Sequence, residues 1–448
     1  MANLNSGDGK ASDFTFENIL MESTSLGKSV QLKYITTDVE IFEHMDKPYL
    51  TGFLTIVDTN NVIAQSDIRG GESITITIKS TREGAKPFTN KFYISKIVTT
   101  QKASSTSETH ILHLIEDIAY ISNLQNVNRS YRGKVETILS KIADDYLGRE
   151  LVFGNNSSVQ SMKLIVPNMH PIEAMAWIKN TASTIDGYPF YMFSSLFSDN
   201  LSFVDLETML NSTPANKEFP YVYSEGSSRS LDPDVKRRII SSFQIKDTED
   251  LYSIINKGLI GGRYEYIDLL TNRRKSFKYD IKNDLLIPLK NKNILPLLQD
   301  EFNYYPYVLE DKEFNQYESR NITNIGGTNA YRTSDDFVDV LSMNEENLLS
   351  NYKLNVISDS MDALFKKSPI SIDITGADFI AGSNSTVVGL SIKLQFPIVI
   401  PEVDESVMKI DTKKSGDYLI FAAKHMFKAE KYDLSLSCLK LSSMRSVE

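Results

Sequence analysis

Residues 368–397 read SPISIDITGADFIAGSNSTVVGLSIKLQFP, and residues 416–443 read GDYLIFAAKHMFKAEKYDLSLSCLKLSS. Short runs rich in β-branched and other apolar residues are separated here by glycine and by polar turns. This composition is typical of β-strands joined by tight turns. The C-terminal stretch therefore predicts a β-rich unit at this end of the chain.

The last two runs of this stretch predict a β-hairpin. Alternate residues from Leu419 to Phe427 are largely apolar, and the polar turn 428–431 leads into a second alternating series that begins at Tyr432. The phase of the second series shifts by one residue at Leu439, which predicts a β-bulge near Cys438.

A single hairpin is only marginally stable in water, and an exposed apolar strand edge promotes association. We therefore expect a barrel that other copies of the chain complete. The apolar strand positions expected to lie at subunit interfaces are Ile74, Ile76, Ile78, Leu419, Phe421, Phe427, Leu434 and Leu436. A proline at Ile420 is expected to abolish this assembly.

Bulk composition limits the class of protein. A chain of 448 residues is too long for one core, so two to four domains are expected. Hydrophobic content of 41% and charged content of 24% are those of a globular protein. The net charge of −10 argues against a protein that binds nucleic acid by neutralising phosphates, but it is compatible with a conduit through which DNA passes without adhering.

Cysteine content excludes a disulfide framework, and hydropathy predicts a protein made and used in a cytosol. Cys438 is the single cysteine, so no intrachain disulfide is possible. The N-terminal residues lack the apolar core of a signal peptide, and no run of 18 apolar residues predicts a membrane span.

The first part of the chain predicts a small β-barrel. Residues 1–12 are polar and are expected to form a flexible arm, followed by a barrel-like domain over 13–117. The expected strands are Val30–Ile35, Leu50–Val57, Ser73–Ile78, Phe92–Thr99 and His110–Ile115.

The period changes from two to 3.6 in the middle of the chain. GKVETILSKIADDYLG (133–148) predicts an amphipathic helix that ends at Gly148, and a second helix is expected from Pro171 to Gly187. A hairpin follows, with a Ser-Asp-Asn turn at 198–200. Residues 118–210 are therefore assigned to an α+β domain.

The remaining segments complete two barrel-like domains around that middle domain. Residues 211–247 are expected to cross over and to contribute to the second barrel. Residues 248–345 continue the α+β domain with a polar, tyrosine-rich elaboration, and 346–448 hold a helix and the second barrel. The predicted fold class is α+β and mostly β, with two barrel-like domains flanking an α+β domain.

Candidate catalytic or metal-binding groups are absent from the sequence. The five histidines are His44, His110, His113, His170 and His425, and none is spaced from another histidine or from Cys438 as a zinc site requires. No nucleotide-binding glycine motif or nucleophile elbow occurs. We therefore predict no enzymatic activity, no cofactor and no metal.

The order of these parts resembles the central baseplate hub protein of contractile-tailed bacteriophages, which seats the central spike on the tail tube. The stretches that carry the resemblance are YLTGFLTIVDTNNVIAQSDIRGGESITITI (49–78), KFYISKIVTT (91–100), ETHILHLIED (108–117), GKVETILSKIADDYLG (133–148), PNMHPIEAMAWIKNTAST (167–184), LLSNYKLNVISDS (348–360) and the C-terminal stretch quoted above. It covers roughly 20–280 and 345–441, whereas 284–340 depart from the family pattern.

The resemblance implies a structural virion protein of the tail baseplate, assembled in the host cytoplasm. It implies a homotrimer whose two tube-like domains per subunit form a pseudo-sixfold ring. The implied partners are the threefold central spike, the sixfold tail tube and other baseplate proteins, with genomic DNA passing through the lumen. Type VI secretion spike proteins share this architecture.

Two other functions stay open on the sequence. One is another tail or baseplate component, such as an adaptor or receptor-binding protein, for which the tyrosine-rich span could offer a sugar platform. The other is a baseplate-associated cell-wall hydrolase, against which the absence of a nucleophile or metal set argues.

Overall fold

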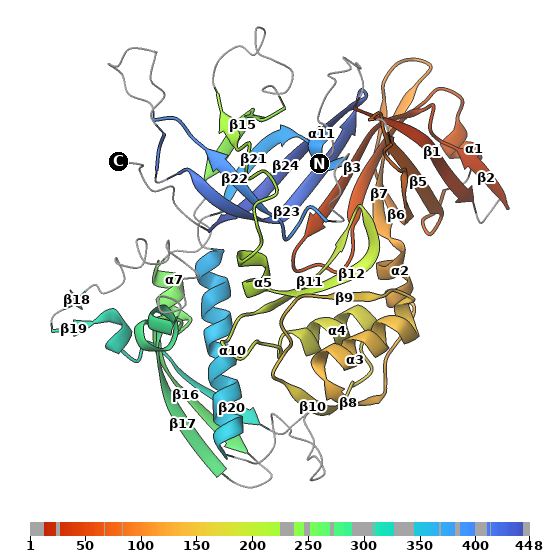
Figure 1. The fold of residues 1–448 in the computed structure, drawn as a ribbon. Coiled ribbons are helices and arrows are strands. Elements are labelled where there is room, and N and C mark those ends of the chain that lie inside the picture. Colours follow the sequence, from red (N-terminus) through yellow and green to blue (C-terminus); the bar gives the residue numbers. More distant parts are fainter. Residues whose placement is uncertain are drawn as a thin grey trace.

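The computed structural model describes residues 13–23, 27–66, 68–82, 84–224, 237–245, 251–268, 273–288, 308–309, 311–326, 345–366, 369–380, 386–398, 410–412 and 414–441. The predicted arm at 1–12 lies outside these ranges, as do residues 301–307 of the tyrosine-rich segment 301–319. Figure 1 shows the arrangement of the elements.

The N-terminal elements are almost all strands. They are β1 (Phe14–Ser23), β2 (Lys28–Gln31), β3 (Thr36–His44), β4 (Thr51–Asp58), α1 (Val62–Gln65), β5 (Ser73–Ser80), β6 (Phe88–Lys102) and β7 (Glu108–Glu116). Their apolar residues alternate with polar ones, so each strand turns one face to the core. Ile74, Ile76 and Ile78 of β5 show this pattern and are all buried.

The middle part mixes helices and short strands. Its elements are α2 (Asp117–Asn123), β8 (Ser130–Lys134), α3 (Val135–Ile142), η1 (a π-helix, Ala143–Leu147), β9 (Leu151–Phe153), β10 (Ser161–Ile165), α4 (Pro171–Lys179), β11 (Phe190–Ser195), β12 (Ser198–Asp205) and α5 (Leu206–Leu210). The apolar faces of α3 and α4 form a separate core with β11 and β12, and this core includes Ile138, Met175 and Phe203.

The last part of the chain returns to the first. Its elements are β13 (Tyr221–Tyr223), β14 (Ile239–Ile240), β15 (Ser242–Ile245), α7 (Leu251–Asn256), β16 (Gly261–Asp268), β17 (Arg273–Asp280), η3 (a π-helix, Lys282–Leu286), β18 (Val308–Leu309), β19 (Lys312–Glu313), η4 (a 3₁₀-helix, Phe314–Gln316), β20 (Asn321–Gly326), α10 (Glu345–Phe365), β21 (Ile370–Thr375), α11 (Ala377–Ile380), β22 (Ser391–Gln395), β23 (Gly416–Lys428) and β24 (Lys431–Lys440).

Among the described residues, fourteen strands form one sheet. The order along its main path is β14-β13-β22-β23-β3-β4-β7-β6-β5-β1-β2, while β24 pairs with β23, β21 with β24 and β15 with β21. Strands from both ends of the chain therefore lie side by side, as the red β3 and the blue β23 do in Figure 1.

β23 joins the two ends because it changes its partner partway along one edge. Residues 416–419 pair with β22, and residues 422–428 pair with β3. Phe421 lies at this change, where the register with β24 shifts opposite Cys438. The predicted bulge is thus present, but the extra residue lies on β23 and not on the strand that carries Cys438.

The predicted fold class is confirmed at the level of a mostly β, α+β fold. The expected arrangement of two barrels around a middle domain stays a prediction. Fourteen of the described strands form one continuous sheet. The β3–β23 pairing is the physical reason, because it sets Val39 against Phe427 and Ile41 against His425 and so continues the core face from one half to the other.

The helix predictions are confirmed with one change of length. α3 and η1 span the predicted helix, and Gly148 ends it in the left-handed conformation with φ 61°. α4 begins at Pro171 as predicted, but it ends at Lys179, and Ile185 is 75% exposed beyond it. The following hairpin turns at Leu196 and Phe197, so the Ser-Asp-Asn sequence lies within β12.

Candidate functional site: a buried polar junction

Three parts of the chain meet at a buried carboxylate on β3. Glu43 follows the alternation of Val39 and Ile41, so β3 directs its side chain into the core, where it is completely buried. The Oε1 atom accepts hydrogen bonds from the N–H of Leu196 at 2.5 Å and from Ser195 Oγ at 3.3 Å. Glu43 therefore fixes the tip of the β11–β12 hairpin to the sheet.

His425 connects the same carboxylate to the C-terminal hairpin. Its Nε2 lies 3.2 Å from Glu43 Oε1, and its Nδ1 lies 2.7 Å from the hydroxyl of Tyr432. Burial, together with the nearby Glu43 charge, raises the pKa of Tyr432 well above its ordinary value, so the phenol stays protonated. We call these three residues the Glu–His–Tyr cluster, which links β3, β23 and β24.

A second buried carboxylate lies at the end of β7. Glu116 accepts hydrogen bonds from the N–H of Leu50 at 2.6 Å and from Ser194 Oγ at 3.1 Å. Arg149 lies 3.8 Å from Glu116 and 2.7 Å from Asp117. Burial raises the pKa of Glu116 to about 7, although the Leu50 hydrogen bond and the Arg149 charge favour the ionised form. Through Ser194, this cluster forms a second connection between the large sheet and β11.

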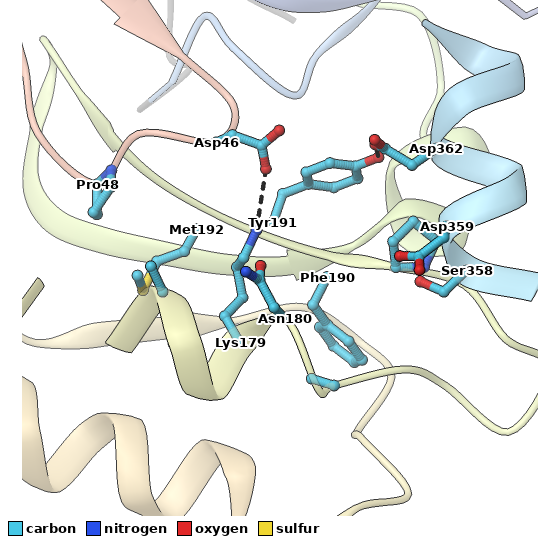
Figure 2. A pocket seen from close by; sticks show the side chains of 13 residues that line it. Asp46, Pro48, Lys179, Asn180, Phe190, Tyr191, Met192, Ser358, Asp359 and Asp362 are labelled. Carbon is cyan, nitrogen blue, oxygen red and sulfur yellow. Dashed lines mark hydrogen bonds and ion pairs between the residues drawn. The ribbon is translucent and has the colours of Figure 1, made fainter. Parts of the chain in front are cut away.

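A pocket of about 570 Å³ is lined in part by β11, the strand that both clusters hold. The β3–β4 connection, α4, β11 and α10 surround it, as Figure 2 shows. Its lining residues include Asp46, Lys179, Tyr191, Asp359 and Asp362. In Figure 2, Lys179 faces Asp46, and the Tyr191 hydroxyl points to Asp362, to which it donates a hydrogen bond.

Two lysines and two aspartates form a charged network next to this pocket. Asp46 lies 3.2 Å from Lys179 and 2.7 Å from Lys366, and Lys366 lies 2.8 Å from Asp362. Burial opposes ionisation of Asp46, but the two lysines outweigh it and lower its pKa. Both ammonium groups also face the ring of Tyr191, at 5.9 and 5.3 Å from its centroid.

This network holds the C-terminal end of α10 against the middle part of the chain. Asp362 and Lys366 are one helical turn apart on α10 and at its end, so both reach the same side. Burial, followed by the charge of Asp362, raises the pKa of Asp359 to about 6. The pocket thus carries an excess of carboxylates that the neighbouring lysines largely compensate.

The predicted interface residues lie inside a single copy of the chain. The side chains of Ile74, Ile76, Ile78, Leu419, Phe427, Leu434 and Leu436 are 0 to 1% exposed. They belong to the hydrophobic core, whereas Phe421 at the bulge is only partly buried. Phe421 is therefore the one residue of the predicted set whose side chain reaches the surface of the chain.

The two histidines of β7 lie on opposite faces of the strand. His110 is buried on β7 and His113 is on the opposite, partly exposed face, as their spacing predicts. Within the described ranges, no group of three or more His, Cys, Asp or Glu side chains is placed to hold a metal ion. No helix in the described part of the chain is long and apolar enough to cross a membrane.

Sequence reasoning missed the residues of the polar junction. β3 was not predicted, because Asp38, Glu40 and Glu43 dilute the apolar alternation of TTDVEIFEH. Only Val39 and Ile41 in this strand give the signal of a core face. The placement of His425 among apolar strand neighbours was visible, but its partner lies at the other end of the chain.

Comparison with known proteins places the fold. No family model and no curated protein matches the chain. A tail protein from Neisseria meningitidis MC58 aligns over 96% of this chain and 97% of its own, with 12% identity and a TM-score of 0.51. A 43 kDa tail protein of prophage MuSo2 from Shewanella oneidensis aligns over 94% and 98%, with 9% identity and a TM-score of 0.48.

A component of the Escherichia coli type VI secretion system, described as similar to two bacteriophage T4 tail proteins, aligns over 92% of this chain and 76% of its own. Its identity is 8% and its TM-score is 0.42. The chain shares its fold, over nearly its full length, with the Neisseria tail protein. The predicted resemblance to hub-like tail proteins is thereby confirmed at the level of fold.

Proposed function

We propose that this chain is the trimeric hub of a phage-type tail baseplate, where it adapts a threefold central spike to a sixfold tail tube. The fold shared with a tail protein supports a structural role in a tail. The architecture of the sheet supports the trimeric ring, and the net charge supports the DNA channel.

The observation that carries the proposal is the continuity of the sheet across two β-rich halves. Each half contains a long antiparallel hairpin, β6–β7 in the first and β23–β24 in the second, and the β3–β23 pairing sets the halves side by side. A chain with two such halves presents six of them in a trimer. This is the arithmetic required between a threefold and a sixfold partner.

The pairings of the second half support a barrel-like unit. β23 pairs with β22, β22 with β13, and β13 with β14. In the other direction β23 pairs with β24, β24 with β21, and β21 with β15. β14 and β15 are separated only by Ser241, so the two series meet on one segment of chain.

The polar junction fits a part that transmits load without changing shape. The Glu–His–Tyr cluster, the Glu116–Arg149 cluster and the Asp46–Lys366 network each join segments distant in sequence. Buried polar groups of this kind are costly unless all partners are in place, so they fix one arrangement of the parts.

The acidic balance of the chain fits a channel for DNA. A net charge of −10 repels phosphates and so favours passage over binding. The protein would act in the virion baseplate, with the spike, the tube and other baseplate proteins as partners, after assembly in the host cytoplasm. The proposal includes no catalytic step.

The test is the molar mass of the purified chain in solution by light scattering over a range of concentrations. The proposal expects three times the chain mass of 50.6 kDa and, by electron microscopy, a ring with a sixfold outline. Because a spike could be needed to nucleate the ring, the measurement is repeated after co-expression with the spike protein of the same tail. A monomer in both preparations would overturn the proposal.

A further inference from the structure

β6 continues well past the strand that covers its outer edge. β5 pairs with β6 only as far as Tyr93, whereas β6 runs on to Lys102 with β7 on its other side. The register with β7 shifts at Ser95 and again at Val98, and such bulges turn a strand away from its neighbour. The β6–β7 hairpin thus extends beyond the sheet, at the upper right of Figure 1.

The outer half of β6 is exposed on both faces. Every residue from Ser95 to Lys102 is exposed except Thr99, which is partly buried. Ile97 and Val98 at the second bulge are 38% and 44% exposed. An apolar pair on a bare strand is the kind of feature that natural monomers avoid.

The backbone of this segment offers hydrogen-bonding groups to a further strand. Ala103 N–H donates to Ser107 O, so residues 103 and 107 are a hydrogen-bonded pair. From this pair toward the sheet, pairs that are hydrogen-bonded between β6 and β7 alternate with pairs that are not. By this alternation, the N–H and C=O groups of Thr100 and Lys102 point away from β7. Within the described ranges, no strand is paired with them. Their spacing along the strand fits the backbone of a further extended strand.

A second edge of the same sheet has matching properties. β15 pairs with β21 on one side, and no strand is paired with its other side in the described part of the chain. Its four residues equal in number the run Thr99–Lys102 that follows the last bulge of β6. Ile245 on β15 is 46% exposed. β2, at the end of the sheet, also has four residues, but three of them are polar, and polar residues blunt an edge.

We infer that the outer edge of β6 in one copy of the chain pairs with the outer edge of β15 in the next copy. One edge belongs to the first β-rich half and the other to the second, so each copy offers two different surfaces. Such a head-to-tail contact generates a closed ring when the rotation between copies is right. The inference rests on the proposed hub function and specifies which strands hold the ring together.

Cross-linking between introduced cysteines tests this pairing. Thr100→Cys and Gln244→Cys place one thiol on each edge, where both wild-type residues are exposed. The native Cys438 is fully buried, and burial raises the pKa of its thiol, so a bifunctional maleimide reacts with the introduced thiols. The two single variants are co-expressed with different affinity tags, and the double variant is prepared separately.

The expected result is a covalent dimer in the co-expressed pair, none in either variant alone, and a ladder that stops at three chains in the double variant. Lys431→Cys combined with Gln244→Cys is the matched control and should give no product, since Lys431 is exposed at the start of β24, a strand that is paired on both sides. A product from Thr100→Cys alone would show that β6 pairs with itself and would overturn the inference.

The outcomes separate this inference from the proposed function. A trimer by light scattering without any cross-link overturns the β6–β15 contact and leaves the hub intact. A ladder that continues past three chains supports the contact and overturns the closed trimer. A monomer that gives no cross-link overturns both.

A proline substitution provides a second measurement. Thr100→Pro removes an N–H that points outward and leaves the bonds between β6 and β7 in place. Thr100→Ala is its control, because it also removes the hydroxyl that lies 3.0 Å from His110 Nδ1. We expect the proline variant to be monomeric with unchanged circular dichroism, and the alanine variant to assemble. Assembly of the proline variant would contradict the inference.

Discussion

The Nε2 atom of His425 lies 3.2 Å from the Oε1 atom of Glu43, and neither side chain is exposed to solvent. The two residues come from opposite ends of the chain and from the two strands whose pairing makes one sheet of the two halves. An ionisable pair in such a position contributes little when intact, but it is costly to break, because the remaining partner is left buried alone. The contact therefore contributes mainly to the specificity of the β3–β23 pairing and less to its stability.

Glu43→Ala is expected to lower the free energy of unfolding by about 3 kcal/mol, because it leaves the Leu196 N–H without its acceptor and removes the buried carboxylate beside His425. The midpoint of urea unfolding measures this. Glu40→Ala is the matched control: Glu40 is on the opposite face of β3 and pairs with Lys424 at 2.8 Å on the surface, so its loss should cost less than about 1 kcal/mol. Equal effects of the two variants would contradict the assigned role of Glu43.

The Glu116→Gln variant is expected to gain stability relative to the wild type as the pH rises. The pKa of Glu116 is raised from 4.5 to about 7 in the folded chain, so the folded state binds more protons than the unfolded state between these values. The stability contributed by the protonated form is complete below pH 4.5 and is lost as the pH rises through 7.

Glutamine cannot lose this contribution, so the variant should gain on the wild type by about 3 kcal/mol between pH 4.5 and 8. Urea midpoints of both proteins across this range measure the difference. Glu108→Gln, on the same strand but with a side chain that is 47% exposed, is the control. A flat profile for Glu116→Gln would show that the carboxyl is ionised in the folded chain.

Asp359→Asn is expected to raise the thermal midpoint at pH 8 but not at pH 3.5. The pKa of Asp359 is raised to about 6 by burial and by Asp362, so its ionised form is disfavoured in the folded chain. Stability is therefore lost as the pH rises from 3.8 to 6, and the amide removes that loss. Differential scanning calorimetry of both proteins at the two pH values measures the thermal midpoints. An equal shift of the midpoint at both pH values would contradict an effect of the Asp359 charge.

Gly376→Ala is expected to destabilise the C-terminal half by about 1–3 kcal/mol or more. Gly376 N–H donates to the carbonyl of Tyr432 at 2.7 Å, and a methyl group at this position would overlap the buried ring of Tyr432. Chemical denaturation gives the magnitude. Introducing the same change beside Tyr432→Leu serves as the control, because the smaller side chain removes the overlap and should recover part of the loss.

The parts of the fold with a clean local period were predictable from the sequence. The alternation in Ile74, Ile76 and Ile78 defines β5, and the helical spacing of Ile138, Leu139 and Ile142 defines α3. In these segments the local pattern and the tertiary environment agree, so no distant residue is needed to interpret them.

The parts that depend on distant partners were not predictable. A glutamate in the alternation of β3 indicates a surface position, and only the approach of His425 and of the Leu196 peptide makes it a core residue. Apolar alternation likewise shows that Leu434 and Leu436 are buried, but not whether the same copy or another copy buries them. The structure shows that the same copy does.

Ile420 illustrates the same limit of local pattern. Its side chain is completely buried, and its N–H donates to the carbonyl of Leu390 at 2.9 Å. A proline there removes a bond inside the sheet, so it would unfold the C-terminal half and would not report on assembly. Thr100, whose backbone groups point outward, is the more informative position.

The change of partner along β23 has a mechanical consequence. Its pairs with β3 run along the strand from Ala422 with His44 to Lys428 with Asp38, so tension applied along the strand loads all the hydrogen bonds between them at once. Such a joint resists by shear, whereas a hairpin pulled from its open end yields one bond at a time. A thrust delivered to one half of the chain would accordingly reach the other half through a stiff coupling.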